Sequence, residues 1–296
     1  MTLSLIVNPS AGGGRAGAAL PGVQQTLRRL GLAHRVQTTR SLDHARELAE
    51  AAAAAGETAV AFGGDGLIGA VAGALRQGDG LLGVLPGGRG NDFARMLGIP
   101  LDAQAACAVL ADGHVCRIDL GQVGARTFVG IASCGFDSVA NRIANETTLV
   151  RGNLVYVYGA LRALAGWQPA TFTITIDGTR QTVTGYTVAA ANSRYYGGGM
   201  MLAPDATLTD GMLDVVIVHE TPKLRFLRLL PTVFKGTHIR RDAVEVLRGA
   251  TIEIAASRPF TLFADGDPIA ELPVTVGTLP GAVRAIVPGT SAQAGA

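Results

Sequence analysis

The sequence predicts an α/β N-terminal domain with a mostly parallel sheet, followed by a mainly antiparallel β domain. In the first 120 residues short apolar runs alternate with helical patterns, an order that gives a parallel sheet covered by helices. After about Gly113 most runs are β-branched and bounded by turn residues, which favours antiparallel strands. With 296 residues, 48% of them hydrophobic, the chain can bury two cores. We therefore expect domains at 1–120 and 121–289, with the C-terminal end free to return to the first domain.

The expected elements of the first domain follow one another in strand and helix order. LSLIVN is an apolar run before a Gly-rich turn, and AALPGVQQTLRRLG is helical and closes at Gly31. HRVQTT is strand-like, and the next helix begins at Ser41, a residue suited to cap it. TAVAFGG and LLGVLPGG give two further strands, with helices through Leu75, around NDFARMLG and from Asp102 to Asp112.

The second domain is expected to consist mostly of strands. Its β-branched runs are RIDLGQV, RTFVGIAS, ATFTITIDG, RQTVTGYTVAAAN, GMLDVVIVH, TIEIAAS and PFTLFADGD. Asp177-Gly178 lies between two of these runs, and this dipeptide is typical of a tight hairpin turn. Helices are the minority and are expected at 140–148, 153–165 and 223–235.

Charge and cysteine content limit the classes of function. The formal net charge of +2 gives no overall basicity, so we expect no nucleic-acid partner. The three cysteines lie far apart and in no metal-binding spacing, which favours a reducing cytoplasm. No apolar stretch is long enough to cross a bilayer. We expect a cytoplasmic protein that at most contacts the inner face of the membrane peripherally, and its oligomeric state, a homodimer included, stays open.

Three Gly-rich turns follow strands of the first domain: NPSAGGGR, GGDG and PGGRGND. In an open α/β sheet they meet at the carboxyl edge, and each leads into a helix N-terminus, whose free N–H groups attract anions. Neither GxxxxGK[ST] nor GxGxxG follows the first strand, which disfavours Walker and Rossmann binding. The carboxylates of Asp65, Asp92 and Asp119 would repel phosphates unless a divalent cation lay between them, so they favour Mg²⁺ and phosphoryl transfer. For Asp92 the alternative is an ordinary helix cap.

Four segments together resemble the diacylglycerol kinase catalytic family, which includes bacterial lipid kinases and the sphingosine and ceramide kinases. They are GGDG at 63–66, PGGRGNDFAR at 86–95, YYGGGMMLAPDATLTDGMLDV at 195–215 and ADGD at 264–267. The resemblance implies an ATP-dependent kinase that phosphorylates a lipid hydroxyl, such as that of diacylglycerol. It also implies an N-terminal domain like that of NAD kinases and a β-rich lipid-binding domain, with nucleotide and lipid meeting in the cleft between them.

By position, the resemblance assigns the nucleotide site to the three turns and the end of the second strand. The residues are Asn8, Pro9, Gly12, Thr39, Gly63, Gly64, Asp65, Gly66, Gly88 and Asn91. Leu67 and Arg89 belong to the same set but replace threonines that are usual in the family. A hydroxyl donor to phosphate is thus missing at Leu67, while Arg89 brings a guanidinium able to bind phosphate with two hydrogen bonds. Asp65, Asp92 and Asp119 would form a catalytic acidic network around the phosphates and Mg²⁺.

The resemblance also assigns a general base and a structural metal loop. The family has Asp-Gly-Glu, whose glutamate takes the proton from the lipid hydroxyl; here residues 265–267 are Asp-Gly-Asp, which makes Asp267 the expected base. Its side chain is one methylene shorter, so the backbone or a water has to compensate, and a simple turn is the alternative. The metal loop would use Asp210, the carbonyl of Met212, and Thr207, which stands where the family often has an acid or an amide.

A basic segment and two other functions complete the sequence-based expectations. Residues 223–248 hold seven Lys/Arg and two acidic residues among Leu, Phe and Val, which suits contact with anionic lipid headgroups; the alternative is a packing helix with its arginines in water. Pro231 disfavours one straight helix.

The other functions are an NAD kinase-like enzyme, because GGDG is shared with that class, and an inactive nucleotide- or lipid-binding regulator, suggested by Leu67 and Asp267. The lipid itself is not defined.

Overall fold

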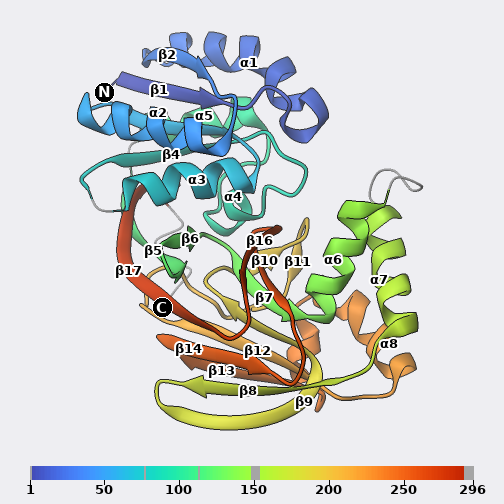
Figure 1. The fold of residues 1–296 in the computed structure, drawn as a ribbon. Helices are drawn as coiled ribbons and strands as arrows, with labels where there is room; N and C mark the ends of the chain where they lie inside the picture. Colours follow the sequence, from blue (N-terminus) through green and yellow to red (C-terminus); the bar gives the residue numbers. More distant parts are fainter. Residues whose placement is uncertain (1, 77, 113, 148–153, 290–296) are drawn as a thin grey trace.

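In the computed structural model, residues 2–76, 78–112, 114–147 and 154–289 are described. The N-terminal part, in the upper half of Figure 1, is a parallel sheet with the strand order β2-β1-β3-β4. Its strands are β1 (Thr2–Val7), β2 (Ala33–Thr38), β3 (Thr58–Gly63) and β4 (Leu81–Pro86). β1, β3 and β4 are almost wholly buried, which is why they read as continuous apolar runs.

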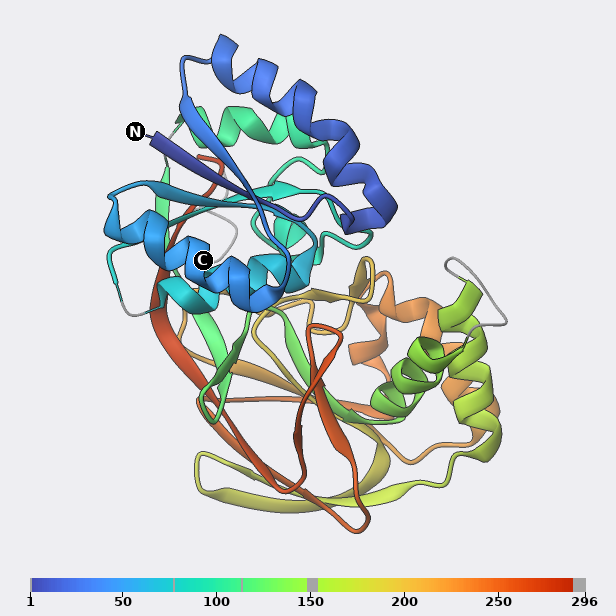
Figure 2. The same cartoon turned by 45° about the horizontal axis from the view of Figure 1, so that its top comes forward.

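Helices cover both faces of this sheet. They are α1 (Ala11–Arg29), α2 (Leu42–Ala54), α3 (Asp65–Leu75), the short α4 (Asp92–Met96) and α5 (Ala103–Asp112). α1 packs against α5 and α2 against α3, and Figure 2 shows the strands passing between these two pairs. The Ser41 cap is confirmed, because its hydroxyl oxygen accepts a hydrogen bond from the backbone N–H of His44 at 3.0 Å.

The C-terminal part is an antiparallel sheet with a few helices at one side (Figure 1). Its strands are β5 (Val115–Val123), β6 (Arg126–Phe128), β7 (Ile131–Gly135), β8 (Ala170–Ile176), β9 (Thr179–Ala191), β12 (Leu213–His219), β13 (Val244–Gly249), β14 (Thr251–Ala256), β15 (Thr261–Ala264), β16 (Asp267–Glu271) and β17 (Val274–Ile286). A separate small ribbon joins β10 (Tyr195–Tyr196) and β11 (Met200–Met201). The helices are α6 (Phe136–Glu146), α7 (Leu154–Gly166), α8 (Lys223–Val233) and the 3-10 turn η1 (Thr237–Arg240).

The long strand β17 joins the two parts. It pairs with β14 and β5 in antiparallel fashion and, near its end, with β4 in parallel through Arg284 and Ala285. Strands of both parts therefore belong to one hydrogen-bonded sheet of 15 strands. The buried apolar residues still form separate clusters, one around the parallel strands and two around the antiparallel strands. Backbone pairing with the start of β4 thus helps to hold the junction between the two parts.

The fold class predicted from the sequence is confirmed. The hairpin over Asp177-Gly178 is present, with β8 and β9 joined by these two residues at positive φ. The expected helices at 140–148 and 153–165 correspond to α6 and α7, but positions 148 and 153 lie outside the described residues. The basic segment 223–248 is not one amphipathic unit, because α8 ends at Val233 and the last part is β13. No helix among the described residues has the length and apolar character needed to cross a bilayer.

Candidate active site

The turn after β1 forms a glycine-lined concavity. Gly12, Gly13 and Gly14 all have positive φ, at 64°, 75° and 95°, so the regular part of α1 begins only after them. A side chain at Gly12 would meet the carbonyl oxygen of Gly87 at 2.5 Å, so only glycine fits there. Arg15, which follows, donates from Nε to the Gly12 carbonyl at 3.1 Å. The N–H groups of Gly13 and Gly14 both donate to the Ser10 carbonyl at 3.1 Å, which fixes the shape of the turn.

The turn after β3 leads directly into α3. Gly64 occupies the N-cap position in an extended conformation with no side-chain cap, which leaves the first N–H groups of α3 for a ligand. One carboxylate oxygen of Asp65 accepts a hydrogen bond from the backbone N–H of Phe93 at 2.9 Å, so this turn is tied to the next one. Leu67 is only 3% exposed and packs against Gly63, so it belongs to the core as well as to the edge of the site.

The turn after β4 approaches the GGDG turn closely. A Cβ on Gly88 would lie 2.5 Å from the Cα of Gly64, so glycine is required for the two turns to meet. Asn91 has the left-handed φ of 53°, and its side-chain oxygen accepts a hydrogen bond from the N–H of Gly88 at 2.7 Å. Such strain in a non-glycine residue is typical of functional sites. Arg89 at the tip is exposed and makes no hydrogen bond or ion pair within the described part of the chain.

Asp92 is buried where the two parts of the protein meet. Its Oδ2 accepts a hydrogen bond from the backbone N–H of Gly198 at 2.7 Å, across to the β10–β11 ribbon, so it does not act as a simple helix cap. Its Oδ1 is buried and has no hydrogen-bond partner among the described residues. Burial is the main cause that raises the pKa of Asp92, and the charge of Asp65 adds to it. A buried carboxylate oxygen without a partner is well placed to receive a cation.

The Asp-Gly-Asp segment is the two-residue turn between β15 and β16. Asp265 and Gly266 have φ values of 52° and 94°, as a tight hairpin turn requires. The Asp265 carboxylate accepts hydrogen bonds from the N–H groups of Val129 at 2.9 Å and Gly130 at 2.8 Å, which fixes the turn. Burial, followed by the charge of Asp65, raises the pKa of Asp265 to about 7. The turn interpretation and the active-site interpretation are thus both consistent with this segment, since the turn presents the exposed Asp267.

These elements line one open pocket of about 420 Å³. It is lined by Asn8, Ser10, Ala11, Gly12, Gly13, Leu42, Gly64, Gly66, Leu67, Gly88, Arg89 and Asp267. The structure therefore brings Asp267, from the C-terminal part, to the same pocket as the three glycine turns of the N-terminal part. This convergence of residues more than 170 positions apart is the main geometric feature of the site.

The remaining expected nucleotide residues do not line this pocket. Gly63 ends β3, opposite Pro86 of β4. Pro9 packs on α1 at Gly17, and the Thr39 hydroxyl donates to the carbonyl oxygen of Ser41 at 2.6 Å. Asp65, Asn91 and Asp92 support the turns through the contacts given above and do not line the pocket themselves.

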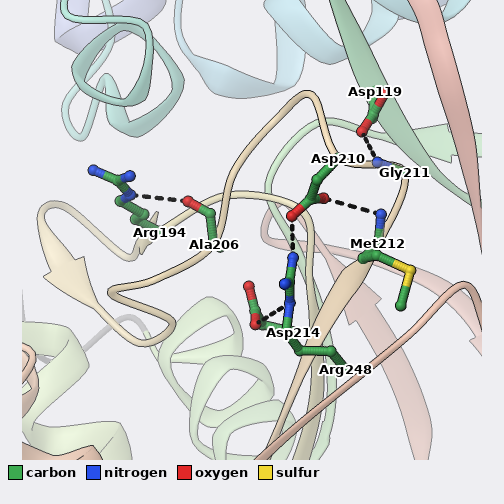
Figure 3. A network of polar contacts seen from close by, with 8 residues as sticks. All are labelled: Asp119, Arg194, Ala206, Asp210, Gly211, Met212, Asp214 and Arg248. Atoms are coloured by element: carbon green, nitrogen blue, oxygen red, sulfur yellow. Dashed lines mark hydrogen bonds and ion pairs between the residues drawn. The ribbon is translucent and has the colours of Figure 1, made fainter. Parts of the chain in front are cut away.

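Asp119 lies away from the pocket and is fully engaged with the backbone. Its Oδ1 accepts a hydrogen bond from the N–H of Gly281 at 2.6 Å. Its Oδ2 accepts one from the N–H of Gly211 at 2.7 Å, which Figure 3 shows. Only 2% of this residue is exposed. The structure thus places Asp119 between β17 and the loop that holds Asp210.

Sequence reasoning missed several supporting residues. Asp265 was expected only as part of a motif, yet it anchors the turn that carries Asp267. Asn141 of α6 donates to the carbonyl of Gly266 at 3.2 Å and braces the same turn. Gly198 belongs to the segment 195–215, but no local pattern indicates that its N–H donates to Asp92. These contacts join segments far apart in the sequence, so no local pattern announces them.

Comparisons with known proteins agree with this architecture. Residues 2–123 match the diacylglycerol kinase catalytic domain, and residues 130–287 match the YegS C-terminal NAD kinase beta sandwich-like domain. A diacylglycerol kinase of Mycobacterium tuberculosis strain H37Rv is 34% identical over 294 residues, covering 97% of this chain and 95% of that one. A diacylglycerol kinase of Bacillus subtilis is 30% identical, covering 86% of each chain. A crystal structure of a diacylglycerol kinase from Bacillus anthracis shares the fold, with a TM-score of 0.76, 21% identity and 98% of each chain covered.

The α/β domain contributes glycine turns and carboxylates, and the β-rich domain adds an acid to the same pocket. This combination defines a phosphotransferase of the lipid kinase class. The chain belongs to the diacylglycerol kinase catalytic family and is a lipid kinase.

Proposed function

We propose that the protein transfers the γ-phosphoryl group of ATP to the hydroxyl of diacylglycerol or a closely related lipid alcohol. The observation that carries the proposal is the pocket shared by the glycine turns and Asp267. The turns supply backbone N–H groups and a helix N-terminus for phosphates, and Asp267 supplies a carboxylate on the opposite side. Relatives named diacylglycerol kinase over nearly the full chain support this choice of lipid.

The nucleotide is proposed to bind with its phosphates over the three turns. Gly12, Gly64 and Gly88 leave room for the phosphates to approach the backbone, and the exposed guanidinium of Arg89 is free to bind one of them. This arginine compensates for the hydroxyl that Leu67 does not provide. Leu67 instead closes the apolar floor of the pocket.

A divalent cation fits beside Asp65 and Asp92. One oxygen of Asp65 accepts from Phe93 and one of Asp92 accepts from Gly198, which leaves the second oxygen of each carboxylate for a ligand. Hard divalent cations prefer such oxygens, so Asp65 and Asp92 are the residues that would hold Mg²⁺. When bound there, Mg²⁺ neutralises charge on the phosphates during transfer.

Asp267 is proposed to act as the general base. It accepts the proton of the lipid hydroxyl while the hydroxyl oxygen forms a bond to the γ-phosphorus and the bond from that phosphorus to the bridging oxygen of ADP breaks. The products are ADP and the lipid phosphate. The turn holds Asp267 through the two backbone hydrogen bonds to Asp265 and the contact of Asn141 with Gly266.

The protein is proposed to meet its lipid at the cytoplasmic face of an anionic membrane through the outer surface of α8. Phe226, Leu229 and Val233 of α8 are buried, while Leu224 and Phe234 are 62% and 56% exposed. Exposed basic side chains flank these two apolar ones, namely Lys223, Arg225, Arg228 and Lys235. Exposed apolar side chains among basic ones are the composition that binds anionic headgroups.

Vesicle sedimentation tests this surface. Wild type is expected to bind vesicles of equal parts phosphatidylglycerol and phosphatidylcholine, and the double change Arg225→Glu and Arg228→Glu is expected to weaken binding by at least about tenfold. The matched control reverses two exposed arginines of α1, Arg28 and Arg29, and should bind like wild type. Equal binding by the α8 variant and wild type would exclude this surface. Light scattering of the same samples would decide whether the protein is a homodimer.

A kinase assay with labelled ATP and a panel of acceptors tests the function itself. Diacylglycerol, phosphatidylglycerol, sphingosine and NAD are offered separately with Mg²⁺, and the organic and aqueous phases are resolved by chromatography. Label in phosphatidate is the expected result. Label in NAD phosphate alone would point to an NAD kinase-like enzyme, and no label in any acceptor would point to an inactive regulator.

A further inference from the structure

Arg248 and Asp214 face each other across two paired strands. They are direct partners in the register of β12 and β13, and Arg248 Nε lies 3.3 Å from Asp214 Oδ1. The Asp214 side chain is only 5% exposed. Burial raises its pKa to about 6, and the charge of Arg248 is the largest opposing influence. The Arg248 guanidinium is therefore the main counter-charge of this buried carboxylate, and Arg194 contributes a smaller one.

The same guanidinium also binds Asp210. Arg248 Nη2 donates to Asp210 Oδ2, as Figure 3 shows, so one arginine bridges two carboxylates. Asp210 Oδ1 accepts a hydrogen bond from the N–H of Met212 at 3.0 Å. Both oxygens of Asp210 are thus engaged by groups of the protein. A planar guanidinium with several donors suits this two-carboxylate arrangement better than a lysine would.

The residues expected to hold a structural Mg²⁺ do not fit one in this arrangement. Asp210 is already paired with Arg248, and Met212 contributes at most a carbonyl. The Thr207 hydroxyl is buried without a partner among the described residues, but a single neutral hydroxyl is a weak ligand for a hard dication. Within the described ranges, no group of three or more His, Cys, Asp or Glu side chains is arranged to hold a metal ion.

The loop that Arg248 holds is connected to the domain junction. Gly211, next to Asp210, donates its N–H to Asp119, and Asp119 in turn accepts from Gly281 of β17. At the start of the loop, Arg194 donates from Nε to the carbonyl of Ala206 at 2.9 Å (Figure 3). Fixing Asp210 therefore fixes a chain of contacts that reaches the strand joining the two parts of the protein.

We propose that in this protein Arg248 takes the place of the structural divalent cation. By holding Asp210 and Asp214 together, it positions the loop of residues 205–212, which contains Ala206, Asp210 and Gly211. The loop is held by an internal cation that cannot dissociate, so its conformation does not depend on the Mg²⁺ concentration. The proposal is independent of the proposed reaction, because it concerns a site away from the pocket.

Manganese binding to the nucleotide-free protein tests the proposal, with free Mn²⁺ measured by electron paramagnetic resonance. Wild type and Asp210→Asn are expected to bind the same number of ions. Arg248→Met is expected to bind one more ion than wild type, because it frees Asp210 and Asp214, and adding Asp210→Asn to it should remove that ion. The control Arg180→Met changes an exposed arginine of β9 and should bind like wild type.

Thermal unfolding gives a second measurement on the same proteins. Arg248→Met is expected to lower Tm by roughly 5 °C, with recovery in millimolar Mn²⁺, while Arg248→Lys keeps most of the wild-type Tm. Loss of one Mn²⁺ ion from wild type on Asp210→Asn would overturn the proposal, and so would a folded Arg248→Met that gains no ion. If Arg248→Met does not fold, the comparison of wild type with Asp210→Asn still decides.

Discussion

The pocket and the network around Arg248 use the same kinds of side chain in opposite ways. In the pocket, the side chains of Arg89 and Asp267 are exposed and, in the part of the chain that the structure describes, make no hydrogen bond or ion pair. In the network, Asp210 and Asp214 are paired with Arg248, and Asp119 is held by two backbone N–H groups. The first region keeps its charges available to a ligand and the second satisfies them internally.

This difference separates motif residues that do chemistry from those that hold structure. The resemblance assigns Asp65, Asp92 and Asp119 to one acidic network, although Asp119 lies within β5 and the other two begin α3 and α4. Only Asp65 and Asp92 retain a carboxylate oxygen without a protein partner in the described chain. Substitutions that remove charge but keep side-chain size should therefore affect activity in one region and stability in the other.

Among the residues that support the glycine turns, the largest effect is expected for Asp65→Asn. Asparagine keeps the oxygen that accepts from Phe93, so the turn should stay folded, while the charge that holds the divalent cation is lost. We expect kcat to fall roughly 10²- to 10³-fold, with little change in Tm. Steady-state kinetics over a Mg²⁺ titration would check this. A well-folded Asp65→Asn variant with the wild-type kcat would show that Asp65 does not hold the cation needed for phosphoryl transfer.

The pH dependence of stability should report Asp265. Its folded pKa of about 7 is raised from 3.8, so its contribution to stability is fully present below about pH 4 and is lost as pH rises through 7. Between pH 4 and 8 the free energy of unfolding of wild type should fall by roughly 2 to 4 kcal/mol more than that of Asp265→Asn. Urea unfolding at several pH values measures the free energy of unfolding of both proteins as a function of pH. The same pH dependence in both proteins would show that Asp265 does not titrate in this range.

Asp119→Asn should lower the stability of the protein and leave its KM for ATP almost unchanged. The substitution leaves one of the N–H groups of Gly211 and Gly281 facing an amide donor, which should lower the free energy of unfolding by about 1 to 3 kcal/mol. The KM for ATP should stay within about twofold, because Asp119 does not line the pocket. Unchanged stability with a strongly raised KM would instead support the expected acidic network around the phosphates.

The smallest effect is expected for Arg89→Met. The side chain is exposed and unpaired within the described residues, so Tm should not change. Loss of the guanidinium should raise the KM for ATP about tenfold. Arg89→Lys is the control and should recover part of the affinity, because it restores charge without the paired donors. An unaltered KM would mean that Arg89 stays in solvent when ATP binds.

Much of the fold was predictable because its signals are local. The buried runs of β1, β3 and β4 and the glycines that follow them indicate a parallel sheet with a polar edge. β17 was missed, because VTVGTLPGAVRAI contains glycines and a proline and only its pairing with β14, β5 and β4 makes it a strand. Strand register likewise decides that Arg248 stands opposite Asp214.

The candidate site was predictable in its residues but not in its geometry. The motifs identify Gly12, Gly64, Gly88 and Asp267, all of which line the pocket. They do not show that Asp210 is paired with an arginine 38 positions away, because that contact depends on how two distant strands align. Residue identity thus indicates the chemistry, and long-range pairing decides which carboxylates remain available for it.

The most direct test of the central claim is single-turnover transfer of labelled phosphate from ATP to diacylglycerol by wild type, Asp267→Asn and Asp267→Glu, with ATP binding measured in the same samples. If Asp267 is the base at the shared pocket, Asp267→Asn should bind ATP like wild type and transfer roughly 10²- to 10⁴-fold more slowly, and Asp267→Glu should retain most of the rate. Transfer by Asp267→Asn at the wild-type rate would contradict the assignment of the base and the role of the shared pocket.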